Sequence, residues 1–529
     1  MKTIRQPVRA LQFRAVLFIV FLAGLLVLAY WPALRGGFIW DDDAYVTDNP
    51  MLSAPDGWRS IWFSAHRQSQ FFPLVYSTLR LEYTLWGLNP LGYHLVNLVL
   101  HAINALLVWR VLKRLTVPGA WIAAGLFAFH PVQVESVAWI SELKNVQSTL
   151  FYLLSLLAWL RFIETDARSR WGTYGLALFF YLLALLSKTT TCTLPAALLL
   201  AVWMRGEKIT ARRMGQVVPF VALGVAAGLL SIWWESHLGN YRENVGQHLT
   251  GLQRVLLASH ALWFYVSKLL CPVNLTFSYP HWGLNVGDAA NYLWLAGCAA
   301  VVVAGYIFRK KLSNAMIAAV IFFVATLSPL LGFIPLYTFL YSYVADHYQY
   351  VACIGLFCLA ADGLRRLPTM ASISVLILLA AITWQQAHAY HDIKTLWRDT
   401  LVKNPASWFS HNNLGMILKE EGNTDEAVAH YQEAIRLHHD YANPNYNLGI
   451  IYYQRGQVDE ALKHFQETVR LTPDDSEARN NFGATLRAKG RLDEAIEQFR
   501  AAIRLNQDYP LAQANLERTV EMKQLAAPF

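Results

Sequence analysis

Charged residues are scarce in this sequence of 529 residues: they make up 15% of the chain, whereas 55% of its residues are hydrophobic. A soluble protein carries about a quarter charged residues, so that class is excluded for most of the chain. Cysteine is rare as well, with five residues and no C-x-x-C pair, which argues against a zinc site or a disulfide framework. Tryptophan (19) and tyrosine (25) are abundant, and their rings favour membrane interfaces. The composition predicts a polytopic membrane protein with a further part appended.

The charge is unevenly distributed along the chain. Residues 401–529 carry 14 basic and 18 acidic side chains, whereas residues 1–400 carry 30 basic and 18 acidic ones. The positive excess therefore belongs to the apolar part. Because no clustered basic face accompanies it, nucleic acid is not an expected partner.

Apolar runs of about 20 residues are the unit in which membrane spans are counted. We expect eleven spans, two of them short, with the segment 251–272 as an interfacial or re-entrant helix. The expected spans are residues 11–33, 93–112, 118–138, 145–163, 172–187, 190–204, 216–234, 290–308, 314–335, 349–364 and 369–388.

Basic clusters follow every second expected span. With eleven spans and a cytoplasmic N-terminus, all of these clusters lie inside, as the positive-inside rule requires. An even count with a cytoplasmic C-terminus is the alternative, and it misplaces at least one cluster. The odd count places residues 34–92 and 389–529 outside. The clusters are Lys2, Arg5, Arg9 and Arg14; Lys113 and Arg114; Arg161, Arg168 and Arg170; Arg205, Lys208, Arg212 and Arg213; Arg309, Lys310 and Lys311; and Arg365 and Arg366.

Three segments after residue 405 superimpose at a 34-residue period: 412–437, 446–471 and 480–505. Paired glycines align in all three copies, and so does an alanine followed four residues later by tyrosine or phenylalanine. This pattern resembles the tetratricopeptide repeat, in which such positions are contacts between paired helices. The segment 510–525 is typical of a capping helix. Such arrays bind peptides or proteins; stabilisation of the membrane part or self-assembly is the alternative role.

Polar residues gather at the predicted outer ends of the spans. Acids and bases collected at one membrane depth indicate a site. Lys188 lies between two apolar runs with no acid near it in sequence, so it either snorkels to the interface or binds a lipid phosphate. For Glu142, Arg242 and Glu243 we expect plain surface solvation. The candidate residues are Asp41, Asp42 and Asp43; His130, Glu135, Lys144 and Asn145; Ser187 and Lys188; and Asp346, His347 and Tyr348.

Four motifs in this order resemble the transmembrane and tetratricopeptide-repeat O-mannosyltransferase family, especially its bacterial members. They are "FIWDDDAYVTDNP", "FHPVQVESVAWISELKNVQSTLFYLLS", "LLALLSKTTTCTLP" and "VADHYQYV". The resemblance implies the GT-C fold, in which a multi-span glycosyltransferase uses a polyprenyl-phosphate-linked sugar at its outer face. The sequence departs from the family at three positions where arginine is common: Phe72, Leu143 and His347.

The resemblance also assigns roles. Asp41 and Asp42 match the family's acidic pair and are expected to be catalytic, one as the base and the other orienting the acceptor or a metal. Lys188, His347 and Lys144 are expected to hold the donor phosphate, His347 most strongly when protonated. The supporting residues are expected to be Asp43, His130, Glu135, Ser187, Asp346 and Tyr348.

The expected fold is all-α: a GT-C-like membrane domain (1–388), a linker helix (389–407), and three tetratricopeptide repeats with a capping helix (408–529). The expected function is transfer of a mannose-like hexose from polyprenyl phosphate to a hydroxyl of a protein or glycan on the outer face of the membrane. The polyprenyl-phosphate-linked sugar is the expected donor; a divalent cation at Asp41 and Asp42 is left open, and no other cofactor is expected. The protein is expected in a bacterial inner membrane, with its partners being lipid, lipid-linked sugar and an acceptor polypeptide. A non-enzymatic repeat scaffold and, more weakly, a transporter are the alternatives.

Overall fold

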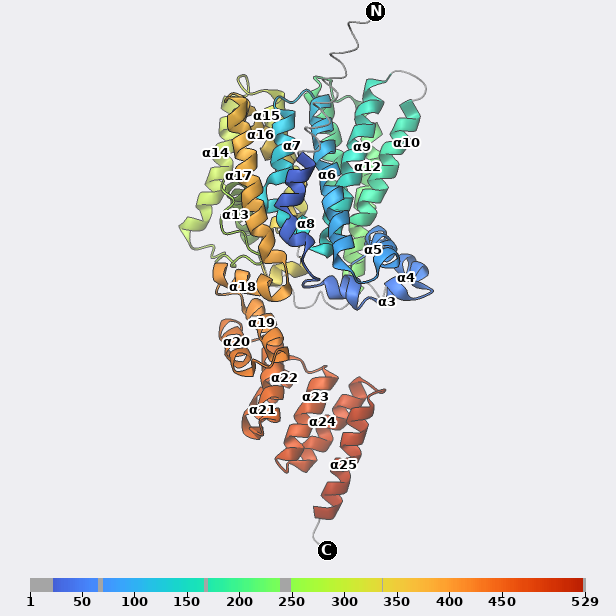
Figure 1. Cartoon of the computed structure of the whole chain (residues 1–529), viewed down its shortest axis with the longest axis vertical. Helices are drawn as coiled ribbons and strands as arrows, with labels where there is room; N and C mark the ends of the chain where they lie inside the picture. The colour runs from blue at the N-terminus through green and yellow to red at the C-terminus, as the bar shows by residue number, and fades with distance from the viewer. Residues whose placement is uncertain (1–21, 65–69, 166–169, 238–248, 335, 527–529) are drawn as a thin grey trace, which may run out of the picture. The chain divides into compact units, whose positions relative to one another are not determined.

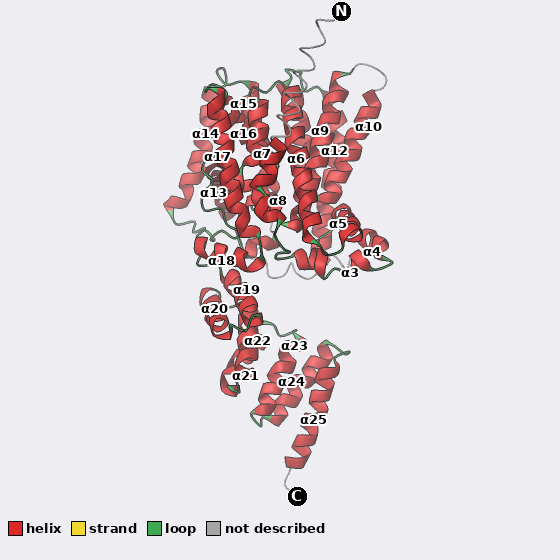
Figure 2. Cartoon of the chain, in the orientation of Figure 1, coloured by secondary structure: helices red, strands yellow, loops and turns green. Residues whose placement is uncertain are grey.

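The protein is helical throughout the residues that its computed structural model describes, which are 22–64, 70–165, 170–237, 249–334 and 336–526. No strand occurs in these ranges, so the expected all-α fold class is confirmed for them (Figure 2). The chain divides into two compact units, Met1–Leu396 and Trp397–Phe529. Each unit is described by itself.

The first unit is a bundle of apolar helices, and α3, α4 and α5 lie at one end of it (Figure 1). Residues 22–29 are helical and lead into α2. The other helices, in order, are α2 (Trp31–Leu34), α3 (Pro50–Ser53), α4 (Gly57–Phe63), α5 (Pro73–Trp86), α6 (Pro90–Arg114), α7 (Ala120–Phe129), α8 (Val134–Ala138), α9 (Leu143–Glu164), α10 (Arg170–Ser187), α11 (Leu194–Met204), α12 (Ala211–His237), α13 (Gly251–Leu270), α14 (Tyr292–Ile307), α15 (Asn314–Leu327), α16 (Cys353–Leu364) and α17 (Thr369–Ala387).

Helices long and apolar enough to cross a membrane occur at six places in the described residues, and four shorter apolar helices accompany them. These ten helices fall on ten of the eleven expected spans. Of the first expected span, 11–33, residues 11–21 lie outside the described residues, and residues 22–29 are helical. Helix α13 is not among the six, and its interfacial position stays a prediction. The number of spans itself stays a prediction.

The apolar run 118–138 does not form one helix, contrary to expectation. Helix α7 ends at Phe129, because His130 has extended backbone angles (φ −77°, ψ 128°) and precedes Pro131. Proline disfavours the helical conformation of the residue before it and has no N–H to donate. The chain then continues through short turns and α8 to Trp139. This break places polar side chains from residues 130–145 inside the bundle.

The second unit consists of α18 (Ile393–Lys403), which straddles the division, and seven further helices. Repeat pairs are α19 (Trp408–Glu420) with α20 (Thr424–Leu437), α21 (Ala442–Gln454) with α22 (Val458–Leu471), and α23 (Ser476–Ala488) with α24 (Leu492–Leu505), followed by α25 (Pro510–Ala526). Helices of a pair pack against one another, and each pair packs against the next.

The two aligned glycines of each repeat serve different purposes. A Cβ atom on Gly449 would lie 2.8 Å from the ring of Phe465, so glycine there lets α21 and α22 approach. Gly456 has φ +72° in the turn between them, a conformation that side chains other than glycine rarely adopt. Both features recur at the matching positions of the other two repeats.

Gly449→Ala is therefore expected to destabilise the repeat unit by about 1–3 kcal/mol, the usual cost of overpacking. Thermal unfolding followed by circular dichroism measures the change. Gln454→Ala, at an exposed position of the same helix, should change the stability by no more than about 0.5 kcal/mol. Equal stability of both variants would contradict the proposed close contact.

Candidate functional site

The three consecutive aspartates occupy three different environments. Asp42 is fully buried, and its carboxylate accepts hydrogen bonds from the backbone N–H groups of Ile39 (2.9 Å) and Ser141 (2.8 Å). Asp41 is partly exposed and accepts a hydrogen bond from the Ser141 hydroxyl at 2.8 Å. Asp43 is exposed and accepts from the backbone N–H of Ala44 at 2.6 Å. Only Asp41 therefore combines solvent access with contact to the rest of the bundle.

Burial governs the acidity of the first two carboxyl groups. Burial and the neighbouring charge of Asp41 raise the pKa of Asp42 to about 8, although hydrogen bonds from Ile39 and Ser141 oppose the rise. Burial also raises the pKa of Asp41, and the positive charge of Lys144 opposes it. A carboxylate with a raised pKa is a stronger base than one in water, which suits it to accept a proton.

A cluster of buried charges lies next to Ser141. Glu142 has no exposed surface, and its carboxylate lies 2.9 Å from the Lys144 ammonium and 3.5 Å from the Lys188 ammonium. Lys188 also donates a hydrogen bond to the Asn145 side-chain oxygen at 2.7 Å, and the Asn145 amide donates to Glu142. Two lysine side chains thus share the Glu142 carboxylate.

His347 connects this cluster to a second buried acid. Its Nδ1 atom lies 3.2 Å from Glu135, and its backbone N–H donates to the other Glu135 oxygen at 2.9 Å. Its Nε2 atom lies 4.0 Å from Glu142, and its backbone carbonyl accepts from the Asn145 amide at 3.0 Å. Residues more than 200 positions apart in the chain thereby meet at one place.

Aromatic rings surround these polar groups. The Lys144 ammonium lies 5.1 Å from the centre of the Tyr45 ring and 5.4 Å from that of Trp139, as in cation–π pairs. Trp40, which directly precedes Asp41, has φ +49° and packs edge-on against Phe277 and Tyr341. A bulky residue in this left-handed region is strained, and such strain is found at binding and catalytic sites.

Several predicted residues take other positions. The ring of His130 is buried, accepts from the Val132 backbone N–H and bonds the Leu269 carbonyl at 3.2 Å. Asp346 accepts from the Tyr279 hydroxyl at 3.0 Å, and the Tyr348 hydroxyl bonds Thr338. These contacts fix the loops that border the cluster. Ser187 ends α10 next to Lys188, and its hydroxyl donates to the Leu183 carbonyl.

The expectation that Glu142 solvates the surface is wrong, because the fully buried Glu142 pairs with Lys144 and Lys188. The pairing of Glu142 with Lys188 could not be predicted from the sequence, because 46 positions separate the two residues. The closeness of Glu142 to Lys144 in the sequence was the one feature that could have indicated an ion pair. Arg242 and Glu243, assigned the same surface role, lie outside the described residues. Phe72 and Leu143, which replace arginines expected from the family, are buried apolar side chains.

Basic residues from two separate turns, one at the end of α6 and one between α11 and α12, meet far from these residues. Glu164 bridges Arg114, at 2.8 Å, and Arg205, at 2.6 Å, while Glu207 bonds Arg213 at 3.0 Å. Lys144 and Glu164 lie on the same helix, α9, twenty residues apart. At 1.5 Å per residue this separation is about 30 Å, the thickness of a bilayer's hydrocarbon core. The acidic site and the basic network thus lie at opposite ends of the bundle.

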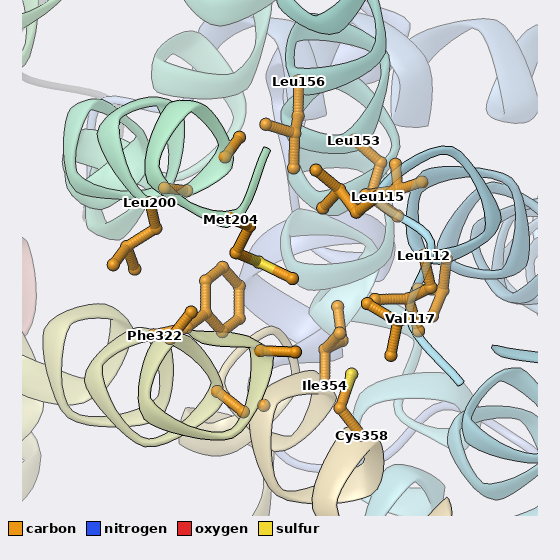
Figure 3. A pocket seen from close by; sticks show the side chains of 18 residues that line it. Leu112, Leu115, Val117, Leu153, Leu156, Leu200, Met204, Phe322, Ile354 and Cys358 are labelled. Atoms are coloured by element: carbon orange, nitrogen blue, oxygen red, sulfur yellow. The ribbon is translucent and has the colours of Figure 1, made fainter. Parts of the chain in front are cut away.

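Two cavities follow one another along α9 and α15. The first, of about 410 Å³, has a polar lining that includes Lys188, Asn145 and Ser148 and the hydroxyls of Thr190, Thr191, Thr193 and Thr326. The second, of about 600 Å³, is lined almost wholly by apolar side chains such as Leu153, Leu156, Ala197 and Phe322 (Figure 3). Helix α9 lines both, since Tyr152 borders the first and Leu153 the second, and α15 does the same through Thr326 and Phe322.

A metal site is not evident in the part of the chain that the structure describes, where no three His, Cys, Asp or Glu side chains are grouped to hold an ion. Asp42, one of the two expected ligands, already accepts two backbone hydrogen bonds.

Comparison with known proteins supports the resemblance. The family described as dolichyl-phosphate-mannose-protein mannosyltransferase matches residues 72–234, and two tetratricopeptide-repeat families match residues 409–474 and 446–510. A protein O-mannosyl-transferase of Caenorhabditis elegans is 25% identical over 458 residues, which cover 80% of this chain and 63% of the relative. The human protein O-mannosyl-transferase TMTC3 is 31% identical over 180 residues, which cover 32% of this chain and 20% of the human protein.

Among solved structures, the tetratricopeptide-repeat protein YrrB is similar to 28% of this chain, with 25% identity, 73% of its own chain covered and a TM-score of 0.24. The chain thus spans less than two thirds of the length of the curated relatives it matches. Its apolar helices agree with those matches in indicating an integral membrane protein. The resemblance found from the motifs is supported: the membrane part of the chain is similar to protein O-mannosyl-transferases, and the part that follows is similar to tetratricopeptide-repeat families. That it is a bacterial-type member stays a prediction.

Proposed function

We propose that the protein is a membrane glycosyltransferase that moves a hexose, such as mannose, from a polyprenyl-phosphate donor to a hydroxyl group of a polypeptide. The observation that carries this proposal is the position of Asp41. It is a partly exposed carboxylate bonded to Ser141, which directly precedes Glu142 of the buried cation cluster. A base and fixed positive charges at one place are what transfer from a sugar phosphate requires.

In the proposed reaction, the acceptor oxygen attacks the anomeric carbon of the sugar. The bond between that carbon and the phosphate oxygen breaks, and the bonding electrons leave with the lipid phosphate. Asp41 takes the proton of the acceptor hydroxyl. Lys188 and Lys144 stabilise the additional negative charge on the phosphate, and His347 contributes when it is protonated. Asp42 holds Ile39 and Ser141 in place through their backbone N–H groups.

The two consecutive cavities support a lipid-linked donor. A polar space beside Lys188 suits a phosphate, and the apolar space that follows suits the isoprenoid chain. A water-soluble nucleotide sugar has no apolar chain that could fill the second cavity.

The network of Arg114, Glu164 and Arg205 supports the proposed orientation. If the positive-inside rule holds, that end faces the cytoplasm, and Asp41 then lies at the outer surface. An acceptor polypeptide would meet the lipid-borne sugar there, with the repeats on the same side.

The donor can be tested by narrowing the apolar cavity. Ala197 lines it and is buried, whereas the neighbouring Ala196 is not among its lining residues. Ala197→Phe is expected to raise the KM for a long-chain polyprenyl-phosphate mannose at least tenfold, while Ala196→Phe leaves it near the wild-type value. A short-chain donor should be affected much less, because its tail does not reach the new ring.

Transfer by the wild-type protein from a nucleotide sugar, but not from polyprenyl-phosphate mannose, would contradict the proposed donor. A non-enzymatic scaffold remains the second candidate, because the repeat array is suited to binding proteins. It predicts that Asp41→Asn changes no property of the protein except charge.

A further inference from the structure

Helix α6 carries a stripe of four polar side chains that are each at most 2% exposed: His94, Asn97, His101 and Asn104. Their spacing of three, four and three residues places them on one face of the helix. A buried polar group destabilises a fold unless it is hydrogen-bonded, and an apolar side chain would fill each position without that cost. Packing alone therefore does not explain the stripe.

Asn97 holds the segment that connects α8 to α9. Its side-chain amide donates to the backbone carbonyls of Trp139, at 3.2 Å, and Ile140, at 3.3 Å. Trp139 has extended backbone angles (φ −83°, ψ 117°), and Ile140–Glu142 forms a single short turn before α9 begins. Because α6 is continuous over Pro90–Arg114, a regular helix fixes this irregular segment through one side chain.

Two other members of the stripe meet different parts of the bundle. His101 bonds the Ala128 carbonyl at 3.1 Å, near the end of α7, and the Asn104 amide donates to the Val146 carbonyl at 2.8 Å, in α9. Among the hydrogen bonds of the described residues, Asn97 is thus the member of the stripe that bonds the segment leading into Ser141.

The turn that Asn97 holds carries two groups of the proposed site. Ser141 donates from its backbone N–H to Asp42 and from its hydroxyl to Asp41, both at 2.8 Å. The next residue, Glu142, lies 2.9 Å from the Lys144 ammonium. A displacement of this turn would therefore change the position of the Asp41 carboxylate and that of the lysines at the same time.

We propose that Asn97 is a positioning residue for the sugar transfer. It fixes the turn Ile140–Glu142, and through Ser141 it holds the Asp41 carboxylate where the acceptor hydroxyl gives up its proton. Asn97 itself is 1% exposed and acts through the two carbonyls, without touching the substrate. Displacing a catalytic group by about 1 Å can lower a rate by about 10²-fold. The inference rests on the proposed function, since it names a residue that serves the same site.

Asn97→Leu removes both hydrogen bonds and keeps a side chain of similar size. The two carbonyls also accept backbone N–H groups of Glu142 and Leu143, so the variant leaves neither without a donor, and the protein should fold. Asn97→Ser is a second variant, whose shorter side chain does not reach the two carbonyls. The matched control is Thr383→Val, because Thr383 is fully buried and donates to the Phe129 carbonyl at 2.8 Å, at the end of α7.

The first measurement is hydrogen exchange of the purified full-length protein in detergent, without any sugar donor. Asn97→Leu and Asn97→Ser should speed exchange of the Ile39 and Ser141 amides about tenfold or more, because both N–H groups bond Asp42 beside the loosened turn. Thr383→Val should leave these two amides at the wild-type rate. Unchanged exchange at Ile39 and Ser141 in both Asn97 variants overturns the inference.

The second measurement is the rate of transfer from polyprenyl-phosphate mannose. Both Asn97 variants should lower kcat about 10–100-fold and leave the KM for the donor within about twofold of wild type, whereas Thr383→Val should keep both constants near wild type. In a Ser141→Ala background, Asn97→Leu should lower kcat by a smaller factor than it does alone, because both changes loosen the same carboxylate.

A raised KM with unchanged kcat overturns the inference, as does an effect of Asn97→Leu that is equally large with and without Ser141→Ala. The two measurements also separate this inference from the function on which it rests. If the wild-type protein transfers no sugar, the proposed function fails, whereas hydrogen exchange still decides whether Asn97 holds the turn.

Discussion

Replacing Asp41 with asparagine should lower the rate of sugar transfer by about 10²–10⁴-fold, the usual contribution of a general base. The amide keeps the size of the side chain and can still accept the hydrogen bond from Ser141, so the fold should be retained. The loss should appear in kcat more than in KM, because Asp41 acts on the acceptor proton in the transition state. Initial rates with a labelled lipid-linked sugar measure it.

Two other aspartates serve as controls. Asp48→Asn, at an exposed position of the same loop, should transfer sugar like wild type. Asp42→Asn should instead lower the stability by about 1–3 kcal/mol, because the amide can accept a hydrogen bond through its oxygen only and leaves one of two buried N–H groups without its acceptor.

The transfer rate of the wild-type protein should fall as the pH is lowered, because burial raises the pKa of Asp41, which is therefore protonated at a higher pH than a carboxylate in water. Full activity of Asp41→Asn would refute the assignment.

The second large effect concerns Glu142. In the described part of the chain, Glu142 is the acid that forms ion pairs with both Lys144 and Lys188. Glu142→Gln removes its negative charge and leaves two buried ammonium groups close together. Breaking a buried ion pair in this way costs about 3–5 kcal/mol. Thermal unfolding of the purified protein in detergent should show a lower melting temperature.

Glu164→Gln is the matched control at the other end of the same helix. Glu164 also pairs with two cations, but it is partly exposed, so its loss should cost no more than about 1 kcal/mol. Adding Lys188→Met to Glu142→Gln should restore part of the stability, because one buried charge is removed. If Glu142→Gln and Glu164→Gln unfold at the same temperature, the buried ion pairs of Glu142 do not stabilise the fold more than the exposed ones of Glu164, and the prediction is wrong.

Much of the fold follows from local patterns in the sequence. The apolar runs locate the helices from α6 to α17, and the 34-residue period locates the repeat helices, because both signals depend on residues close together in the chain. The end of α7 could also have been anticipated, since Pro131 interrupts a run that hydropathy alone counts as continuous. Boundaries were less predictable where short turns such as 189–193 precede a helix.

The site was only partly predictable for a different reason. Asp41, Lys144, Lys188 and His347 could be selected because polar residues are conspicuous beside apolar runs. Their division into roles depends on contacts across the chain: Ser141 bonds both Asp41 and Asp42, and Glu142 pairs with Lys188. No pattern along the sequence distinguishes Asp41 from Asp42, although one is partly exposed and the other is buried beneath two backbone N–H groups.

The central claim is that Asp41 and the lysine cluster transfer a sugar from a lipid phosphate. The most direct measurement uses purified full-length protein, polyprenyl-phosphate mannose with a radioactive sugar and an unfolded polypeptide rich in serine and threonine. We predict that label reaches the polypeptide with wild-type protein and with Asp48→Asn, and does not do so with Asp41→Asn. Equal labelling by wild type and Asp41→Asn would contradict the account.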